Sequence, residues 1–228
     1  VGPNTTVGTR YANPEKAEVL ELGAKIALPS GYLNIAIFDQ EIEDFQTNTF
    51  VGTGFVLANA GSQSADGYEF DLVISPTENI DLAVSGLFID PIYDSYVGAA
   101  PGDLSGTVPS NTPEDTISST VTWNYNVKGW DSFLRISHLY SSQAKLLENP
   151  AHQALIEAKG NGYKEQDTLN LTAGFEKDNI SIKIWGKNIN DDKFLTSAFI
   201  GTADLSETTF YGYPNSFKSY GMTLNYSF

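Results

Sequence analysis

The chain has 228 residues, enough for one sizeable domain or two small ones. Lys and Arg total 13 and Asp and Glu total 28, so the net charge is −15, which argues against nucleic-acid partners because phosphates require a basic surface. Cysteine is absent and histidine occurs twice, which excludes disulfides and thiolate metal sites and leaves too few ligands for a multi-histidine site. No apolar run approaches 18 residues, so the sequence contains no transmembrane helix.

Nine segments alternate apolar and polar side chains with a period of two, the pattern of β-strands with one apolar face. Among the clearest is the segment near 114–127, where Val121, Trp123 and Tyr125 alternate with Thr and Asn residues. A weak helical pattern runs from Pro150 to Lys159. The predicted strands cover about 19–28, 32–45, 62–75, 80–92, 114–127, 131–143, 166–177, 180–190 and 220–228.

Short and long connections alternate along the chain. Tight turns near residues 30, 78, 129 and 178 would lie on one rim, and polar loops at 46–60, 93–113, 144–165 and 191–216 on the other. Short periplasmic turns and long extracellular loops are typical of outer-membrane barrels, whereas a soluble sandwich has no reason to segregate loop length in this way. We therefore predict an all-β, antiparallel transmembrane barrel.

The last predicted strand, Tyr220 to Phe228, places Tyr220, Met222, Leu224, Tyr226 and Phe228 on one face and small or polar residues on the other. This alternation is that of a barrel strand with an apolar lipid-facing side. The polar faces of the predicted strands carry charges that are costly against lipid, so we expect them to line a lumen that holds water or a polar plug. These charges are Glu21, Lys25, Glu69, Asp71, Asp81, Arg135, Glu176 and Lys183.

The number of predicted strands bears on the extent of the domain. If the chain ends in the periplasm, nine strands place Val1 on the extracellular side, whereas complete bacterial barrels have an even number of strands. A first strand within residues 1–10 would make ten, but Gly-Pro-Asn-Thr-Thr has no strand pattern. We therefore expect residues 1–228 to form the C-terminal part of a longer chain.

Four stretches, in order, resemble the TonB-dependent outer-membrane receptors. Pro14-Glu15-Lys16 with Glu21-Leu22-Gly23-Ala24-Lys25 resembles a strand of that family, and Asn59-Ala60-Gly61 with Gly67-Tyr68-Glu69-Phe70-Asp71 resembles its entry into a downward strand. The run from Trp185 to Phe194 resembles the penultimate strand and its exit, and Tyr220 to Phe228 resembles the terminal strand with its final aromatic residue. Each motif alone is weak, but together they span nearly the whole chain.

The resemblance implies a barrel of about 22 strands around a plug, of which this chain supplies roughly the last nine. It also implies a location in the outer membrane of a Gram-negative bacterium, in contact with membrane lipid and lipopolysaccharide. The function would be uptake of a scarce small-molecule ligand, such as a siderophore, haem, cobalamin or an oligosaccharide, with energy from TonB acting through the absent N-terminal region. Leu224, Tyr226 and Phe228 resemble the terminal signal that the barrel-assembly machinery reads.

Candidate ligand contacts lie in the predicted extracellular loops. They are Tyr93, Asp94, Tyr96, Tyr211 and Tyr213, and packing within the loops is the alternative role for each. The acidic groups Asp39 to Asp44 and Asp191-Asp192 either bind Ca²⁺ through oxygen ligands or are solvated rim charges, and we predict no metal site and no cofactor.

Two other classes of function remain as alternatives. A passive porin or small structural barrel would need no plug and would have a short, even-stranded chain. An outer-membrane hydrolase could use His138 as the base of a serine, but no Asp or Ser is placed convincingly beside it in the sequence. His138 alternates with Leu134, Ile136 and Tyr140, which favours an interfacial role, so we predict no catalytic residues.

Overall fold

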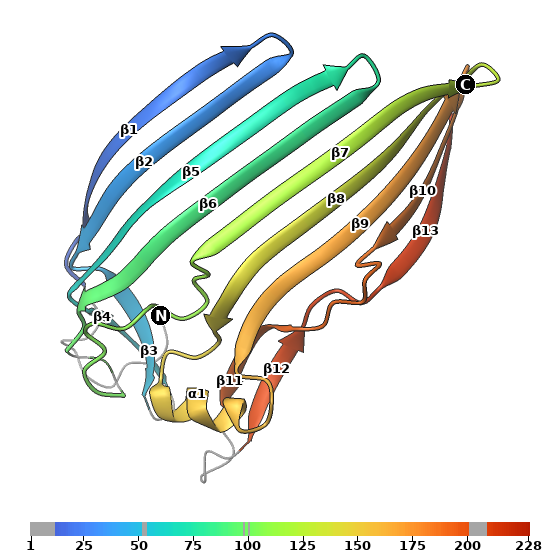
Figure 1. The fold of residues 1–228 in the computed structure, drawn as a ribbon. Coiled ribbons are helices and arrows are strands. Elements are labelled where there is room, and N and C mark those ends of the chain that lie inside the picture. The colour runs from blue at the N-terminus through green and yellow to red at the C-terminus, as the bar shows by residue number, and fades with distance from the viewer. Residues whose placement is uncertain (1–11, 52–53, 98, 100, 201–208) are drawn as a thin grey trace.

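The computed structural model describes residues 12–51, 54–97, 99, 101–200 and 209–228. Most of this part of the chain is β-strand (Figure 1). The elements are β1 (Lys16–Leu28), β2 (Gly31–Glu43), β3 (Gln46–Val51), β4 (Gly54–Asn59), β5 (Ser62–Thr77), β6 (Ile80–Ser95), β7 (Asp115–Val127), β8 (Trp130–Lys145), α1 (Pro150–Glu157), β9 (Tyr163–Lys177), β10 (Ile180–Lys187), β11 (Leu195–Ile200), β12 (Phe210–Pro214) and β13 (Ser219–Tyr226).

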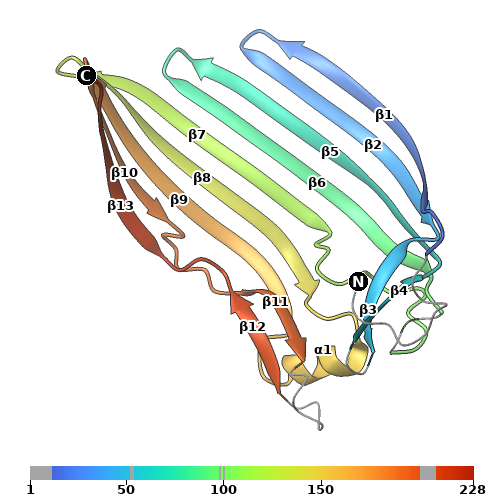
Figure 2. The ribbon, with the colours of Figure 1, turned by 180° about the vertical axis from the view of Figure 1, so that it is seen from behind.

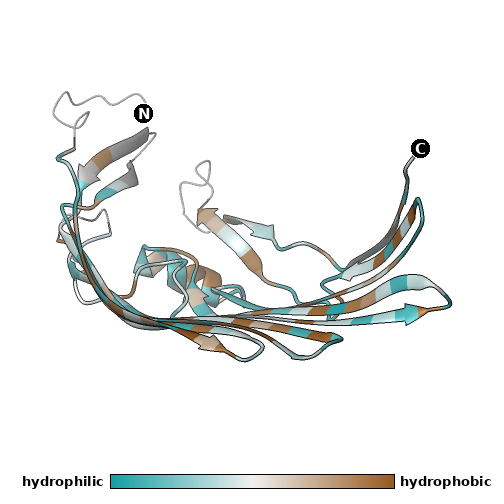
Figure 3. Ribbon diagram, turned by 90° about the horizontal axis from the view of Figure 1, so that it is seen from above, coloured by the Kyte–Doolittle hydropathy of each residue, from teal (hydrophilic) through white to brown (hydrophobic). Residues whose placement is uncertain are grey.

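Nine of the described strands form one antiparallel sheet in the order β1-β2-β5-β6-β7-β8-β9-β10-β13. These strands coincide with the nine predicted from the sequence, so the predicted all-β fold is confirmed. The sheet curves into an open trough, with β1 at one edge and β13 at the other (Figures 1 and 3). Within the described part of the chain, neither strand has a partner along its outer edge.

The registers place apolar side chains in rows that cross the whole sheet. One row pairs Leu22 with Ile37, and Ile37 with Tyr68. Another pairs Ile184 with Met222, whose exposed fractions are 50% and 69%. Exposed apolar area costs about 25 cal/mol per Å² in water, so a continuous apolar face of this kind is suited to lipid.

The connections segregate between the two rims as the sequence predicts. The turns at 28–31, 77–80, 127–130 and 177–180 lie at one rim, together with the C-terminus (Figures 1 and 2). In the last two of these turns Lys128 and Asp178 adopt positive φ angles of 53° and 50°, which is typical of tight hairpin turns. We call this end the short-turn rim and the opposite end the loop rim.

Two segments predicted as loops instead contain short hairpins, which corrects the expectation for 46–60 and for 191–216. β3 pairs with β4, and β11 with β12, each as a two-stranded sheet outside the main one. With five or six residues per strand, the alternation is too short to stand out in the sequence. The weak helical run becomes α1, which begins after Asn149, whose side chain accepts from the Ala151 and His152 amides. Figure 3 shows α1 and the β11–β12 hairpin over the concave side of the sheet.

Candidate functional site

The polar face of the sheet forms a groove on the concave side. Its volume is about 830 Å³, and it crosses β1, β2, β5, β6 and the start of β7. Small residues such as Gly23 and Ala36 keep its floor low, and charged or amide side chains stand along it. The polar residues that line it are Glu21, Lys25, Asn34, Glu69, Asp71, Ser85, Thr116 and Ser118. A groove of this composition holds water or a polar protein surface.

Charge on this polar face is divided between the two halves of the sheet. On β1 to β6 the in-register positions carry Glu21, Glu69, Asp71 and Asp81 against the single Lys25. On β8 to β10 they carry Arg135, Lys164, Lys183 and Lys187 against Asp131 and Glu176. The concave wall is therefore acidic toward β1 and more basic toward β13, so the electric field across it is asymmetric.

Two aromatic rings lie flat on the basic half of the wall, over glycines of the next strand. A Cβ atom on Gly174 would come within 2.1 Å of the Phe133 ring, and one on Gly221 within 2.2 Å of the Trp185 ring. Arg135 lies 5.3 Å from the Phe133 centroid, and Lys187 lies 5.4 Å from the Trp185 ring. The glycines thus leave room for the rings to pack on the backbone, and each cation lies over a ring in a cation–π contact.

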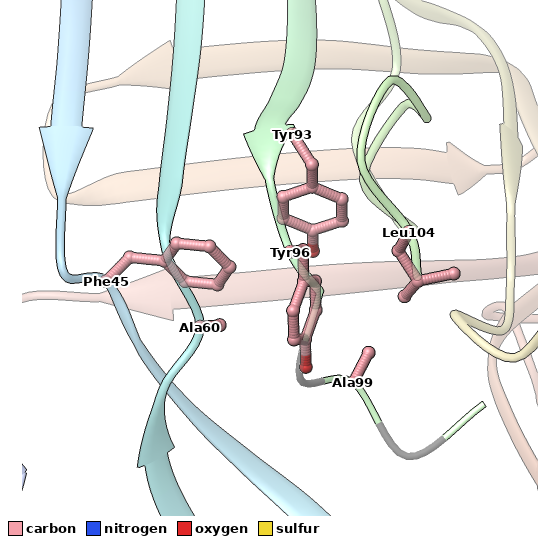
Figure 4. Close-up of a cluster of buried hydrophobic side chains, with 6 residues drawn as sticks. All are labelled: Phe45, Ala60, Tyr93, Tyr96, Ala99 and Leu104. Carbon is pink, nitrogen blue, oxygen red and sulfur yellow. The ribbon is translucent and has the colours of Figure 1, made fainter. Parts of the chain in front are cut away.

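At the loop rim, a buried cluster joins the ends of β2, β5 and β6 (Figure 4). Phe45 stacks on Tyr93 at 5.3 Å between ring centroids and meets the edge of Tyr96 at 5.4 Å. The loop after β6 folds back over these rings, with the Leu104 amide donating to the Tyr96 carbonyl at 3.0 Å. The full set is Phe45, Ala60, Tyr93, Tyr96, Ala99 and Leu104, with Ile42 packed against it.

This cluster determines where three predicted ligand contacts lie. Tyr93 and Tyr96 retain only 7% and 5% of their exposed area, so both pack within the loop layer. Tyr93 lies beyond the roughly ten residues of β6 that a bilayer accommodates. Burial of the Tyr93 hydroxyl, together with the nearby Glu148 charge, raises the pKa of Tyr93. Asp94 is exposed and accepts from the Ser64 hydroxyl at 2.9 Å. A role of these residues in ligand contact remains a prediction.

The other two predicted contacts lie on the β11–β12 hairpin. Tyr211 pairs with Phe199 and Tyr213 with Ser197, so these side chains share one face. Their exposed fractions are 54% for Tyr211 and 58% for Tyr213. The five predicted residues thus fall into three groups. Tyr93 and Tyr96 are buried, Asp94 is exposed beside them, and Tyr211 and Tyr213 are exposed on a separate hairpin. Contact of Tyr211 and Tyr213 with ligand also stays a prediction.

A group of polar side chains, whose hydrogen bonds the sequence does not indicate, continues the edge of β9 beyond the end of β10. The Ile189 amide donates to the Leu169 carbonyl at 2.8 Å. Beyond it, Asn190 Oδ1 accepts from the Leu169 amide at 3.0 Å, and Asp192 Oδ2 accepts from the Asp167 amide at 2.8 Å. Beyond the end of β10, side-chain oxygens therefore accept the hydrogen bonds that the carbonyls of a neighbouring strand would otherwise accept from β9. Asp192 is thus bonded to the backbone of β9 and is not a solvated rim charge, which was one of the two roles expected from the sequence.

Asn188 connects this segment to the chain that follows the hairpin. It is 3% exposed and has a φ angle of 49°. Its Nδ2 donates to the carbonyls of Asp192 and Ser216, and its Oδ1 accepts from the Asp192 amide at 2.8 Å. Asn215 also donates to the Asp192 carbonyl at 2.8 Å. We call Asn188, Asn190, Asp192 and Asn215 the asparagine latch.

The structure corrects one expectation about His138. Asp167 Oδ1 lies 2.6 Å from His138 Nε2, and Ser119 is the direct partner of His138 across β7 and β8. Because Asp167 is 29 residues away, only the strand register reveals the pair. Within the described residues, Ser119 makes no hydrogen bond to His138, so no nucleophile is attached to the pair. The pair lies on the apolar face, since its strand neighbour Ile136 pairs with Val121 there.

The described residues contain no group of three or more His, Asp or Glu side chains arranged to hold a metal ion. In the same part of the chain, no helix has the length and apolar character needed to cross a membrane. At the short-turn rim, Leu224, Tyr226 and Phe228 are exposed, and Phe228 meets the Tyr226 ring edge at 5.1 Å. Nothing in this arrangement tests their predicted role as an assembly signal.

A curved antiparallel sheet with an apolar face, a charged concave face and all long loops at one rim is the wall of a transmembrane β-barrel of the outer-membrane type. The family model described as TonB-dependent receptor-like β-barrel matches residues 2–226. The chain belongs to this family, as its four sequence stretches suggest. The family's members are outer-membrane transporters of Gram-negative bacteria and are generally not enzymes.

Solved structures show the same fold. The chain is similar to the ferric yersiniabactin uptake receptor of Yersinia pestis, with a TM-score of 0.74, 17% identity, and 94% of this chain and 30% of that chain covered. For the ferric-catecholate import receptor of Escherichia coli K12 the TM-score is 0.70 and the identity is 18%, with 100% of this chain and 30% of that chain covered. For the ferripyoverdine receptor of the Pseudomonas aeruginosa outer membrane the TM-score is 0.63 and the identity is 14%, with 95% of this chain and 28% of that chain covered. The chain thus spans about 30% of these receptors' length, and comparison with curated protein sequences gives no match.

Proposed function

We propose that this chain is part of an outer-membrane receptor that takes up a scarce small-molecule ligand with energy supplied through TonB. The observation that carries the proposal is the family match over residues 2–226, on a sheet whose apolar and polar faces suit lipid and a filled lumen. The loop rim would face the exterior and capture the ligand. TonB would act on a part of the receptor outside this chain.

Residues 1–228 would form the C-terminal part of one barrel domain, and the plug would come from elsewhere in the receptor. Two observations support this arrangement. Unpaired strand edges are not tolerated in lipid, and both edges of the described sheet lack partners, so further strands are needed to close the barrel. The charged groove on the concave wall also requires a polar occupant, which a plug would provide.

The same geometry suggests the other partners. The apolar face would contact membrane lipid, and its loop-rim end would meet lipopolysaccharide. The terminal strand β13 would engage the barrel-assembly machinery through Leu224, Tyr226 and Phe228, whose side chains are exposed at the sheet edge.

Deleting Phe228 from the full receptor should lower the amount that is assembled in the outer membrane. Phe228 contacts Tyr226 at the exposed end of the last strand, so its loss changes the terminal signal without disturbing the sheet. Quantitative immunoblots of membrane fractions measure the effect. Phe217→Ala, which removes another exposed aromatic residue, is the control. Equal assembled levels for the deletion and the wild type would remove the signal role.

A passive porin or small structural barrel is the alternative function. The mass of the native polypeptide in outer-membrane preparations separates the two, because a barrel of roughly 22 strands with a plug needs about three times the 24.8 kDa of this chain. A polypeptide of 24.8 kDa would favour the alternative. Uptake that persists at the same rate without TonB would also contradict the proposed function.

A further inference from the structure

The β11–β12 hairpin presents an aromatic face that nothing in the described structure covers. Phe199 lies 5.4 Å from Tyr211 and 6.0 Å from Tyr213, measured between ring centroids. The inter-ring angles are 31° and 36°, so the rings form a shallow platform rather than a cage. All three side chains are at least 43% exposed. By contrast, Ile200 and Phe210 on the opposite face of the hairpin are half-buried.

The hairpin is held in a defined place at the loop rim. The asparagine latch fixes the chain on both sides of it, because Asn188 and Asn215 each donate to the Asp192 carbonyl. Figure 3 shows the hairpin over the concave side of the sheet, which would face the lumen of a closed barrel. An exposed aromatic platform on a fixed support at the mouth of a lumen is an arrangement suited to binding a small molecule.

The charge of the loops limits which small molecules suit this platform. The described hairpin strands carry no charged residue. The four long connections, 44–61, 96–114, 146–162 and 188–218, contain three lysines, Lys159, Lys193 and Lys218, and no arginine. Lys193 is already paired with Asp191 at 2.9 Å. Their carboxylates are Asp44, Asp103, Glu114, Glu148, Glu157, Asp191, Asp192, Asp204 and Glu207.

Acidic loops on this part of the rim lower the local concentration of anions and slow their association, whereas neutral or cationic ligands are not excluded. We propose that the Phe199–Tyr211–Tyr213 platform binds a ligand with a flat apolar face and no net negative charge. This inference rests on the proposed uptake function and narrows its ligand class. Aromatic rings and the apolar faces of pyranose sugars share this chemistry, because both stack on aromatic side chains.

The test measures binding to the full receptor in detergent by equilibrium dialysis, with a neutral maltooligosaccharide, a neutral phenolic alcohol and the anionic iron(III) tris-catecholate complex as probes. We expect one of the neutral probes to bind and the anionic complex to bind at least tenfold more weakly. Phe199→Leu with Tyr211→Leu should weaken binding of the neutral probe by about tenfold or more. Tyr213→Phe keeps the ring, so it should change binding by less than about threefold.

Tyr32→Leu is the matched control, because Tyr32 is a 41% exposed aromatic residue of the concave face near the short-turn rim. Equal effects of Tyr32→Leu and of the hairpin variant would overturn the proposal, as would binding of the anionic complex alone or of no probe. TonB-dependent uptake of the anionic complex by the hairpin variant would overturn the proposed ligand class while leaving the uptake function intact. Uptake that needs no TonB would instead contradict the function.

Discussion

The main sheet and the loop layer at its rim are stabilised in different ways. In the sheet, nine strands share backbone hydrogen bonds, with register shifts only near the strand ends of the β5–β6 and β8–β9 pairs, and side chains act mainly through the medium they face. In the loop layer, a small aromatic cluster around Tyr93 and the asparagine latch around Asn188 provide the order. The wall should therefore tolerate substitutions on its polar face, whereas the loop layer should depend on a few side chains.

The largest effect is expected from Phe45→Ala, which removes the ring that contacts both Tyr93 and Tyr96. Large-to-small changes at buried aromatic residues cost about 3–5 kcal/mol. The cost should fall on the loop layer, so limited proteolysis should cleave the segment after β6 faster while the barrel keeps its folded electrophoretic mobility. Val97→Ala, at a 69% exposed position of the same segment, is the control. Unchanged cleavage would show that the cluster does not order the loops.

Next in size is the difference between the two faces of one strand. Ile136→Arg places a charge on the apolar face near the middle of β8, where it should cost about 2–4 kcal/mol. Ser137→Arg places the same charge on the polar face, one residue away, and should cost less than about 1 kcal/mol. Urea titration of the receptor in lipid vesicles measures both. Equal costs would contradict the assignment of the two faces to lipid and lumen.

Asn188→Ala removes the three hydrogen bonds of a buried side chain in the loop layer, two of which involve Asp192. The backbone amide of residue 188 remains, so about 1–3 kcal/mol of local stability should be lost. Hydrogen exchange of amides in 188–195 and 210–216 should accelerate. Asn161→Ala, at an exposed asparagine of another loop, should leave those amides unchanged. Protection at the wild-type level in Asn188→Ala would mean that the latch is not needed.

The sheet could be predicted from the sequence because lipid on one side and a polar lumen on the other impose a strict period of two. The strand from Asp115 to Val127 was placed to within one residue for that reason. The alternation of short and long connections then fixed which rim each turn occupies.

The loop layer could not be predicted in the same way. Its hairpins are too short to show a period, and Tyr93 and Tyr96 belong to a cluster that joins three separate segments. The contact of His138 with Asp167 depends on a register between β8 and β9 that no local pattern records. The run from Trp185 to Phe194 carries a family resemblance, but the bonds that Asn188 and Asp192 make with distant backbone groups appear only in the structure.

The smallest effect concerns Tyr163 and Glu157, which join the start of β9 to the end of α1. Tyr163 lies beyond the roughly ten residues of β9 that a bilayer accommodates, and its hydrogen bond to Glu157 raises its pKa. Gln153 holds Glu157 by donating to its Oε1 at 2.8 Å. A raised folded-state pKa means that the contact stabilises the loop fully below the ordinary tyrosine pKa of about 10. That stability is lost as the pH rises through the raised value.

Cleavage of the 146–162 segment by a protease active in alkali should therefore accelerate above about pH 10 in the wild-type receptor. Tyr163→Phe lacks the hydroxyl, so its cleavage should already be slightly faster at neutral pH and should show no such acceleration. Tyr211→Phe, an exposed hairpin variant, should follow the wild-type profile. If Tyr163→Phe kept the alkaline acceleration, another group would be responsible, and the junction of α1 with β9 would then depend on backbone contacts, as the sheet does.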